Sequence, residues 1–164
     1  MKTSKTLLAA LALSSALFGA AASPAFAVNE LNTSSGLTTA GAPLALHGFD
    51  PVAYFTEGKP VLGNSKLAAA ANGASYYFSS QANLDMFKAN PAKYAPQYGG
   101  YCAFGVSVAK KFDGDPNQWK IVDGKLYLNL NADIAEKFNA DVPGNLKKAE
   151  GNWPKIQDKA PAAL

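Results

Sequence analysis

The chain has 164 residues, 48% hydrophobic and 16% charged, with a formal net charge of +3 and one cysteine. This length fits a single domain with a core of modest size. The densest basic groups are the pairs Lys110-Lys111 and Lys147-Lys148. The composition therefore argues against binding of nucleic acid or of an anionic membrane surface. One cysteine also excludes a disulfide within the chain.

The first 27 residues have the pattern of a secretory signal peptide. Lys2 and Lys5 precede a run of small and apolar residues over 7–22, and Ala25-Phe26-Ala27 forms an Ala-x-Ala cleavage site. The apolar run is shorter than the roughly 20 residues that a membrane-spanning helix needs. We therefore expect cleavage after Ala27 and a periplasmic or secreted protein with no membrane span after cleavage.

The remaining sequence predicts one folded domain with short flanking segments. Residues 28–42 are rich in Asn, Thr, Ser and Gly and have no apolar period, which is typical of a flexible leader. Hydrophobic segments separated by turn residues fill 43–158, and Trp153-Pro154 is expected to close this domain. Residues 159–164 are then a tail.

Two hairpins and several short helices are predicted within the domain. Asn72-Gly73 and Asp123-Gly124 have the composition of two-residue hairpin turns. They predict antiparallel strands over 67–71 and 74–78, and over 119–122 and 125–130. Helices are expected over 52–55, where Asp50 suits the N-cap, and over 81–90, 132–139 and 146–150. Because strands and helices do not alternate regularly, the fold class is α+β, a small single domain.

Several segments together resemble the exported proteins of the YHS-domain family over about residues 44–156. They are Gly48-Phe49-Asp50-Pro51-Val52-Ala53-Tyr54-Phe55, Tyr76-Tyr77-Phe78-Ser79-Ser80, Phe87 with Pro91 and Tyr94, Tyr98-Gly99-Gly100-Tyr101-Cys102-Ala103, and Val122-Asp123-Gly124-Lys125-Leu126-Tyr127-Leu128-Asn129. The resemblance implies a small metal-associated module, of a kind found alone and beside metal-transporting ATPases and multicomponent monooxygenases. Shorter members are similar to the cysteine-rich domains of heavy-metal sensing.

The chain departs from the shorter members at three positions. Where they carry cysteines, this sequence has Ala53, Ser79 and Asn83. A multi-cysteine site therefore does not carry over, since alanine has no donor atom and the other two are poor ligands for a soft metal.

His47 and Cys102 remain as candidate metal ligands, and Asp50, three residues after His47, could add an oxygen. Thiolate with imidazole suits copper, with zinc as the alternative. A second copy of the chain in a homodimer could supply another His-Cys pair. The leading hypothesis is thus a non-catalytic, periplasmic or secreted copper-binding module.

Purely structural roles for the same three residues also remain open. A lone cysteine can be a small buried apolar residue, His47 a loop residue and Asp50 a helix cap. The chain would then be an interaction or small-ligand module that has lost its metal site. A thiol-dependent redox protein using Cys102 is the second alternative, although one cysteine would need an outside resolving thiol. No phosphate-binding loop or His-Glu-x-x-His motif supports another enzyme class.

Overall fold

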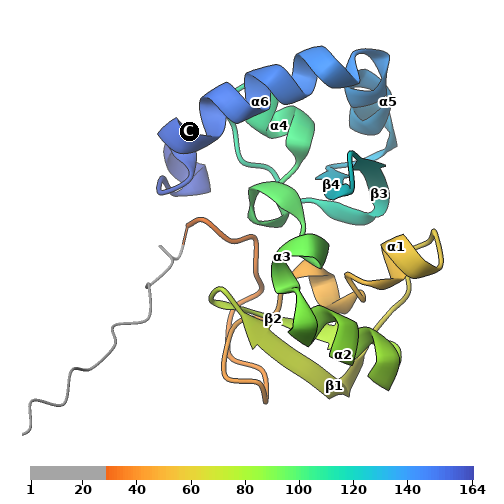
Figure 1. Cartoon of the computed structure of the whole chain (residues 1–164). Helices are drawn as coiled ribbons and strands as arrows, with labels where there is room; N and C mark the ends of the chain where they lie inside the picture. The colour runs from red at the N-terminus through yellow and green to blue at the C-terminus, as the bar shows by residue number, and fades with distance from the viewer. Residues whose placement is uncertain (1–28) are drawn as a thin grey trace, which may run out of the picture.

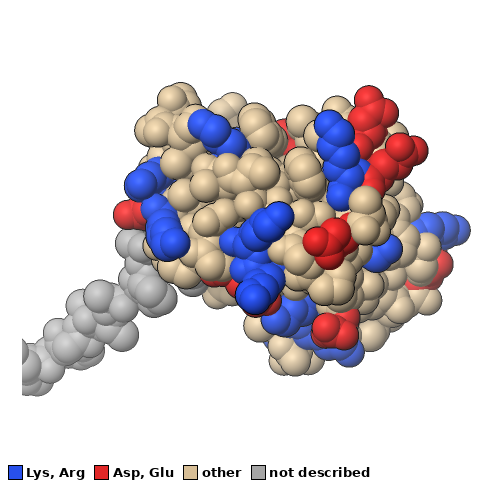
Figure 2. Space-filling view, turned by 90° about the horizontal axis from the view of Figure 1, so that it is seen from above, with Lys and Arg blue, Asp and Glu red and all other residues tan. Residues whose placement is uncertain are grey.

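A computed structural model describes residues 29–164 of the protein, so the predicted signal peptide lies outside the described residues (Figure 1). Six α-helices and two antiparallel two-stranded sheets make up this part, which confirms the α+β class. No helix within 29–164 has both the length and the apolar character to cross a membrane. On the face seen in Figure 2, basic and acidic side chains are interspersed with uncharged ones.

The first half of the fold is a hairpin with short helices around it (Figure 1). Its strands meet at Asn72-Gly73 with Ala71 opposite Ala74, and Ser80 caps the following helix by accepting a hydrogen bond from the Asn83 N–H. The predicted hairpin and helix are thus confirmed. The elements are η1 Leu46–Gly48, α1 Ala53–Thr56, β1 Asn64–Ala71, β2 Ala74–Phe78, α2 Gln81–Ala89 and α3 Pro91–Tyr94.

The second half contains the other hairpin and a longer helix, α6, against which α4 packs (Figure 1). The predicted turn at Asp123-Gly124 is confirmed, with Val122 opposite Lys125. The elements are η2 Gln97–Gly100, α4 Ala103–Ser107, β3 Asp115–Val122, β4 Lys125–Asn129, α5 Ala132–Ala140, α6 Val142–Ile156 and η3 Pro161–Ala163.

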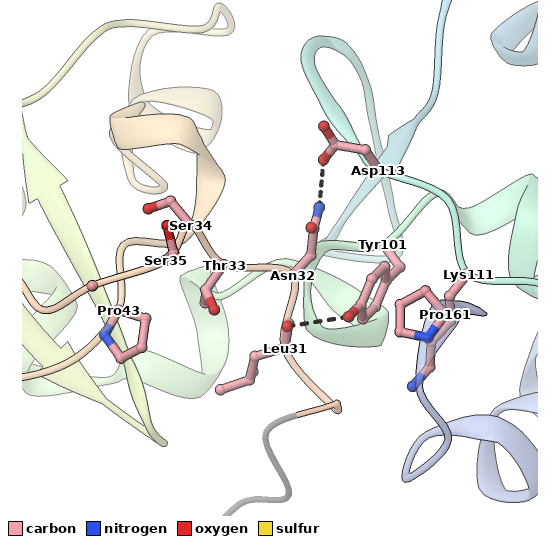
Figure 3. A pocket seen from close by; sticks show the side chains of 11 residues that line it. Leu31, Asn32, Thr33, Ser34, Ser35, Pro43, Tyr101, Lys111, Asp113 and Pro161 are labelled. Atoms are coloured by element: carbon pink, nitrogen blue, oxygen red, sulfur yellow. Dashed lines mark hydrogen bonds between the residues drawn. The ribbon is translucent and has the colours of Figure 1, made fainter. Parts of the chain in front are cut away.

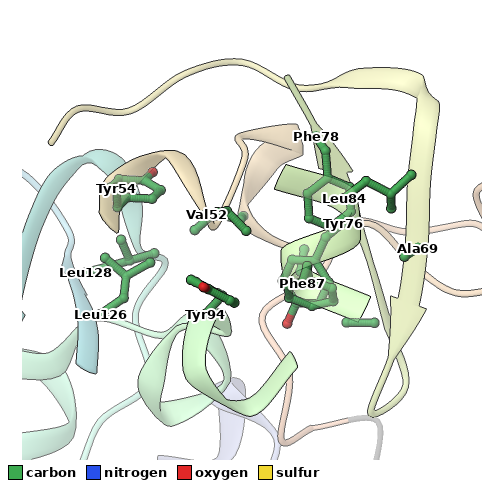
Figure 4. Close-up of a cluster of buried hydrophobic side chains, with 13 residues drawn as sticks. Val52, Tyr54, Ala69, Tyr76, Phe78, Leu84, Phe87, Tyr94, Leu126 and Leu128 are labelled. Carbon is green, nitrogen blue, oxygen red and sulfur yellow. The ribbon is translucent and has the colours of Figure 1, made fainter. Parts of the chain in front are cut away.

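One aromatic-rich core joins the two halves (Figure 4). Leu126 and Leu128 of β4 pack into the same cluster as the side chains of the first hairpin and α2. The fully buried members include Val52, Phe78 and Phe87. Because strand β4 is shared in this way, the hairpins form one packed unit although they are separate sheets.

Helix α6 is longer than predicted, and the expectation that Trp153-Pro154 closes the domain was wrong. The helix begins with Asp141 as a cap, whose carboxylate accepts a hydrogen bond from the Gly144 N–H, and Pro154 lies inside its last turns. Proline has no N–H to donate to the preceding turn, yet the helix continues past Pro154 to Ile156. The short helices α3 and α4 were not predicted either, because four or five residues carry too little periodicity.

The segment expected to be a flexible leader instead lies along the domain from residue 29 onwards. The Asn32 N–H donates to Gly99 O at 2.9 Å, and the Ser34 N–H donates to Leu44 O at 2.9 Å. The expected tail also contacts the domain, since Leu164 packs against the cluster around Tyr101. Polar residues bind distant backbone groups here, which an absence of apolar periodicity does not reveal.

Candidate functional site

Asp50 is fully buried and is the centre of a hydrogen-bond network. Its Oδ1 accepts from the N–H groups of Val52 at 2.8 Å and Ala53 at 3.3 Å. Its Oδ2 accepts from the Ser79 N–H at 2.8 Å, the Ser79 hydroxyl at 2.7 Å and Asn83 Nδ2 at 2.7 Å. The carboxylate therefore holds the start of α1 to the β2–α2 connection, and its acceptor capacity is taken up by the fold.

The three positions where the resemblance implied missing thiols therefore meet in one place. Ala53, Ser79 and Asn83 come from different segments, yet each donates a hydrogen bond to Asp50. In this chain they surround a carboxylate that accepts five hydrogen bonds.

Cys102 is also fully buried and acts as a helix cap. Its Sγ accepts from the Gly105 N–H at 3.3 Å at the start of α4, and its thiol donates to Asn129 Oδ1 at 3.8 Å. Burial raises the pKa of this thiol, and hydrogen bonds from backbone N–H groups of Gly105 and neighbouring residues offset only part of the rise. The thiol is therefore protonated and inaccessible at neutral pH.

His47 differs from Asp50 and Cys102 because its side chain is 50% exposed. Its Nε2 lies 2.9 Å from Oδ1 of Asp113, whose side chain is 53% exposed. The backbone around it is left-handed at three successive residues, with φ of 54° at Leu46, 51° at His47 and 83° at Gly48. Non-glycine residues adopt such angles only where the surroundings enforce them, as they often do at binding sites.

Asp113 is further held by the N-terminal segment. Asn32 Nδ2 donates to the same Oδ1 at 2.6 Å and to Gly100 O at 3.1 Å. Partial burial would raise the pKa of Asp113, but hydrogen bonds from Asn32 and His47, together with the charge of His47, lower it below its usual value. The carboxylate is therefore ionised beside the imidazole.

The His47–Asp113 pair lies at one end of a surface groove. A hollow of about 190 Å³ is lined by Asn32, Thr33, Ser34, Leu44, His47 and Asp113. It shares Asn32, Thr33, Ser34 and Asp113 with a larger hollow of about 560 Å³ that also reaches Tyr101 (Figure 3). The groove and the pair thus form one continuous candidate binding surface.

The sequence-derived ligand set does not come together as a single donor group. Among residues 29–164, no three or more His, Cys, Asp and Glu side chains are placed to hold one metal ion. His47 alone of the three is exposed, and its partner is Asp113 rather than Cys102 or Asp50. Sequence reasoning missed Asp113 and Asn32, which lie 66 and 15 residues from His47 in the chain and give no local signal.

Comparison with known proteins gives a family for part of the chain. The model of the YHS domain matches residues 52–98, which run from the residue before α1 into η2. No curated protein and no solved structure matches the chain. The matched segment contains Ala53, Ser79 and Asn83, the three positions where shorter family members carry cysteines. It contains neither His47 nor Cys102. Residues 52–98 thus match the YHS-domain family.

Proposed function

We propose that the protein is a non-catalytic metal-binding module that is exported to the periplasm or secreted, and that its metal ligands are His47 and Asp113. The observation that carries this proposal is the 2.9 Å contact between two half-exposed donor side chains at the end of a groove. Export rests on the signal-peptide pattern of residues 1–27. The metal association of the family supports the choice of ligand.

The spacing of the pair fits a shared ion. Two ligands at right angles, each about 2.1 Å from a metal, lie about 3 Å apart. A cation could therefore replace the proton between the imidazole and the carboxylate with little movement of either side chain. Water or a second copy of the chain would supply the remaining ligands.

The donor types favour copper(II), with zinc(II) as the alternative. Imidazole and carboxylate are nitrogen and oxygen donors, which suit both ions. Copper(I) prefers sulfur, but the Cys102 thiol is fully buried and already bonded to Gly105 and Asn129. We therefore propose the oxidised copper ion, whereas the sequence left the oxidation state open.

Calorimetric titration of residues 28–164 with copper(II) and zinc(II) tests this. We expect His47→Ala and Asp113→Asn each to weaken binding by about tenfold or more, the scale of one lost coordinate bond or charge partner. Cys102→Ser is the matched control and should leave the affinity unchanged. Binding that survives both surface substitutions and is lost in Cys102→Ser would overturn the proposal.

A second function is favoured by the groove itself. Its larger hollow of about 560 Å³ has the size of a small-ligand site. If the protein takes up no metal, it is an interaction or small-ligand module that has lost its metal site. The thiol-dependent redox alternative requires a reactive Cys102, and the burial of this residue argues against it.

A further inference from the structure

The N-terminal segment 29–36, which we call the strap, crosses the surface beside the His47–Asp113 pair. Besides its backbone bond from Asn32 to Gly99, its Leu31 O accepts a hydrogen bond from the Tyr101 hydroxyl at 3.2 Å (Figure 3). The strap therefore binds the second half of the fold at several points.

A buried lysine anchors the start of the strap. Lys111 is 4% exposed, and its ammonium donates to the carbonyl oxygens of Asn29 at 2.7 Å, Gln157 at 2.6 Å and Lys159 at 2.8 Å. It also lies 5.2 Å and 5.3 Å from the ring centroids of Tyr101 and Trp153. All three N–H donors of the ammonium are thus used, and two aromatic faces add to its stabilisation.

The strap explains why residue 99 is a glycine. A Cβ on Gly99 would lie 1.8 Å from the carbonyl oxygen of Glu30, and Gly99 has a φ of 62°. The group that approaches Gly99 is therefore the backbone of the strap, and no side chain can stand between them.

We propose that Lys111 latches the strap and that the latched strap positions the His47–Asp113 pair through Asn32. The contacts form a continuous route. Lys111 binds the carbonyl of Asn29, and the strap backbone then packs on Gly99, whose carbonyl accepts from the Asn32 N–H. Asn32 Nδ2 in turn donates to both Asp113 Oδ1 and Gly100 O. Lys111 and Asn32 are positioning residues for the pair. The relevance to metal binding rests on the proposed function, whereas the latch and its effect on the pair do not.

Two metal-free signals test the latch, both recorded at one fixed pH. The first is amide hydrogen exchange at Asn32 and Ser34. The second is the set of ring proton shifts of His47, which is unambiguous because the chain has one histidine. We expect Lys111→Met to speed exchange at Asn32 by about tenfold or more and to move the His47 ring signals. Lys110→Met, at the exposed neighbouring lysine, should change neither.

A double-mutant cycle separates the strap from the short path along the backbone between residues 111 and 113. If Lys111 acts through Asn32, Lys111→Met should move the His47 signals in the native background and leave them unchanged once Asn32→Ala is present. Persistence of the shift in the Asn32→Ala background would overturn the positioning route. Unchanged exchange at Asn32 in Lys111→Met would overturn the latch.

Gly99→Ala should displace the strap without altering Lys111. This variant keeps the inference testable if Lys111→Met fails to fold. The new methyl group should displace Glu30, speed exchange at Asn32 and move the His47 ring signals. A folded Gly99→Ala protein with native exchange and native His47 signals would contradict the inference. Absence of copper or zinc uptake by the wild-type protein would count against the proposed function alone.

Discussion

The buried Asp50 and Cys102 and the exposed His47 and Asp113 all carry metal-ligating atoms, yet these atoms differ in whether they can still bind a ligand. Asp50 accepts five hydrogen bonds and Cys102 caps α4, and both residues are fully buried. His47 and Asp113 contact one another and face the groove. Residue type alone therefore does not identify a metal ligand. The donor atom must also be exposed and must not be needed to hold the fold together.

Removing the charge of Asp50 should have the largest effect. In Asp50→Asn, the side-chain amide would face donors from Ser79 and Asn83, so buried N–H groups would oppose one another. We expect the free energy of unfolding to fall by about 3 kcal/mol, as for the loss of hydrogen bonds to a buried charge. Urea unfolding measures the change, and Asp85→Asn, on the exposed face of α2, is the control with a change below about 0.5 kcal/mol. An equally small loss in Asp50→Asn would break the contrast.

Substitutions of Cys102 should change stability as expected for a buried helix cap. Cys102→Ala removes both the helix cap and buried volume, and we expect a loss of about 1–2 kcal/mol in unfolding free energy. Cys102→Ser keeps a capping atom and should lose less than Cys102→Ala. The same urea titration checks this order, and the reverse order would show that Sγ does not serve as the cap.

The reactivity of the Cys102 thiol sharpens the comparison further. Because burial raises its pKa and hides its sulfur, alkylation of the native protein at pH 7 should be slower than that of the urea-unfolded protein by about 100-fold or more. The thiolate forms as pH rises through the pKa, so the native thiol needs a more alkaline solution than an ordinary one. Rapid native alkylation would instead favour the redox alternative.

The exposed pair should matter least for stability. His47→Ala and Asp113→Asn should each change the free energy of unfolding by no more than about 0.5 kcal/mol, since both side chains are half exposed and screened by solvent. The pKa of Asp113 is lowered in the folded protein, so its contribution is present above the ordinary pKa and disappears as pH falls through the folded value. Asp113→Asn should therefore flatten the acid side of the stability profile slightly. A loss comparable to that of Asp50→Asn would remove the distinction between the two groups.

Local chemistry made much of the fold predictable. The turns at Asn72-Gly73 and Asp123-Gly124 determine both hairpins, because each signal involves residues within a few positions of one another. The α+β class follows from them. The role of Asp50 as a helix cap was also one of the interpretations open from sequence, although its bonds to Ser79 and Asn83 were not.

The site was less predictable because its contacts join distant parts of the chain. His47 and Asp113 are 66 residues apart, Asn32 and Asp113 are 81 apart, and Lys111 binds carbonyls 82 and 46 residues away. None of these contacts leaves a periodic pattern. Gly99-Gly100 is part of the segments that carry the family resemblance, but only the fold shows that the backbone of the strap approaches Gly99.

The hydrogen bonds of Lys111 also indicate where the two ends of the chain could be joined. Its ammonium binds carbonyls near both ends of the described fold, and Asn29 Nδ2 donates to Asp158 O at 3.0 Å. Residue 29 therefore lies beside residues 157–159 near the C-terminal end of the chain. A short linker could join them while new ends are opened at the Asn72-Gly73 turn, giving a circular permutant. The order in which the segments are joined is thus separable from their arrangement in space.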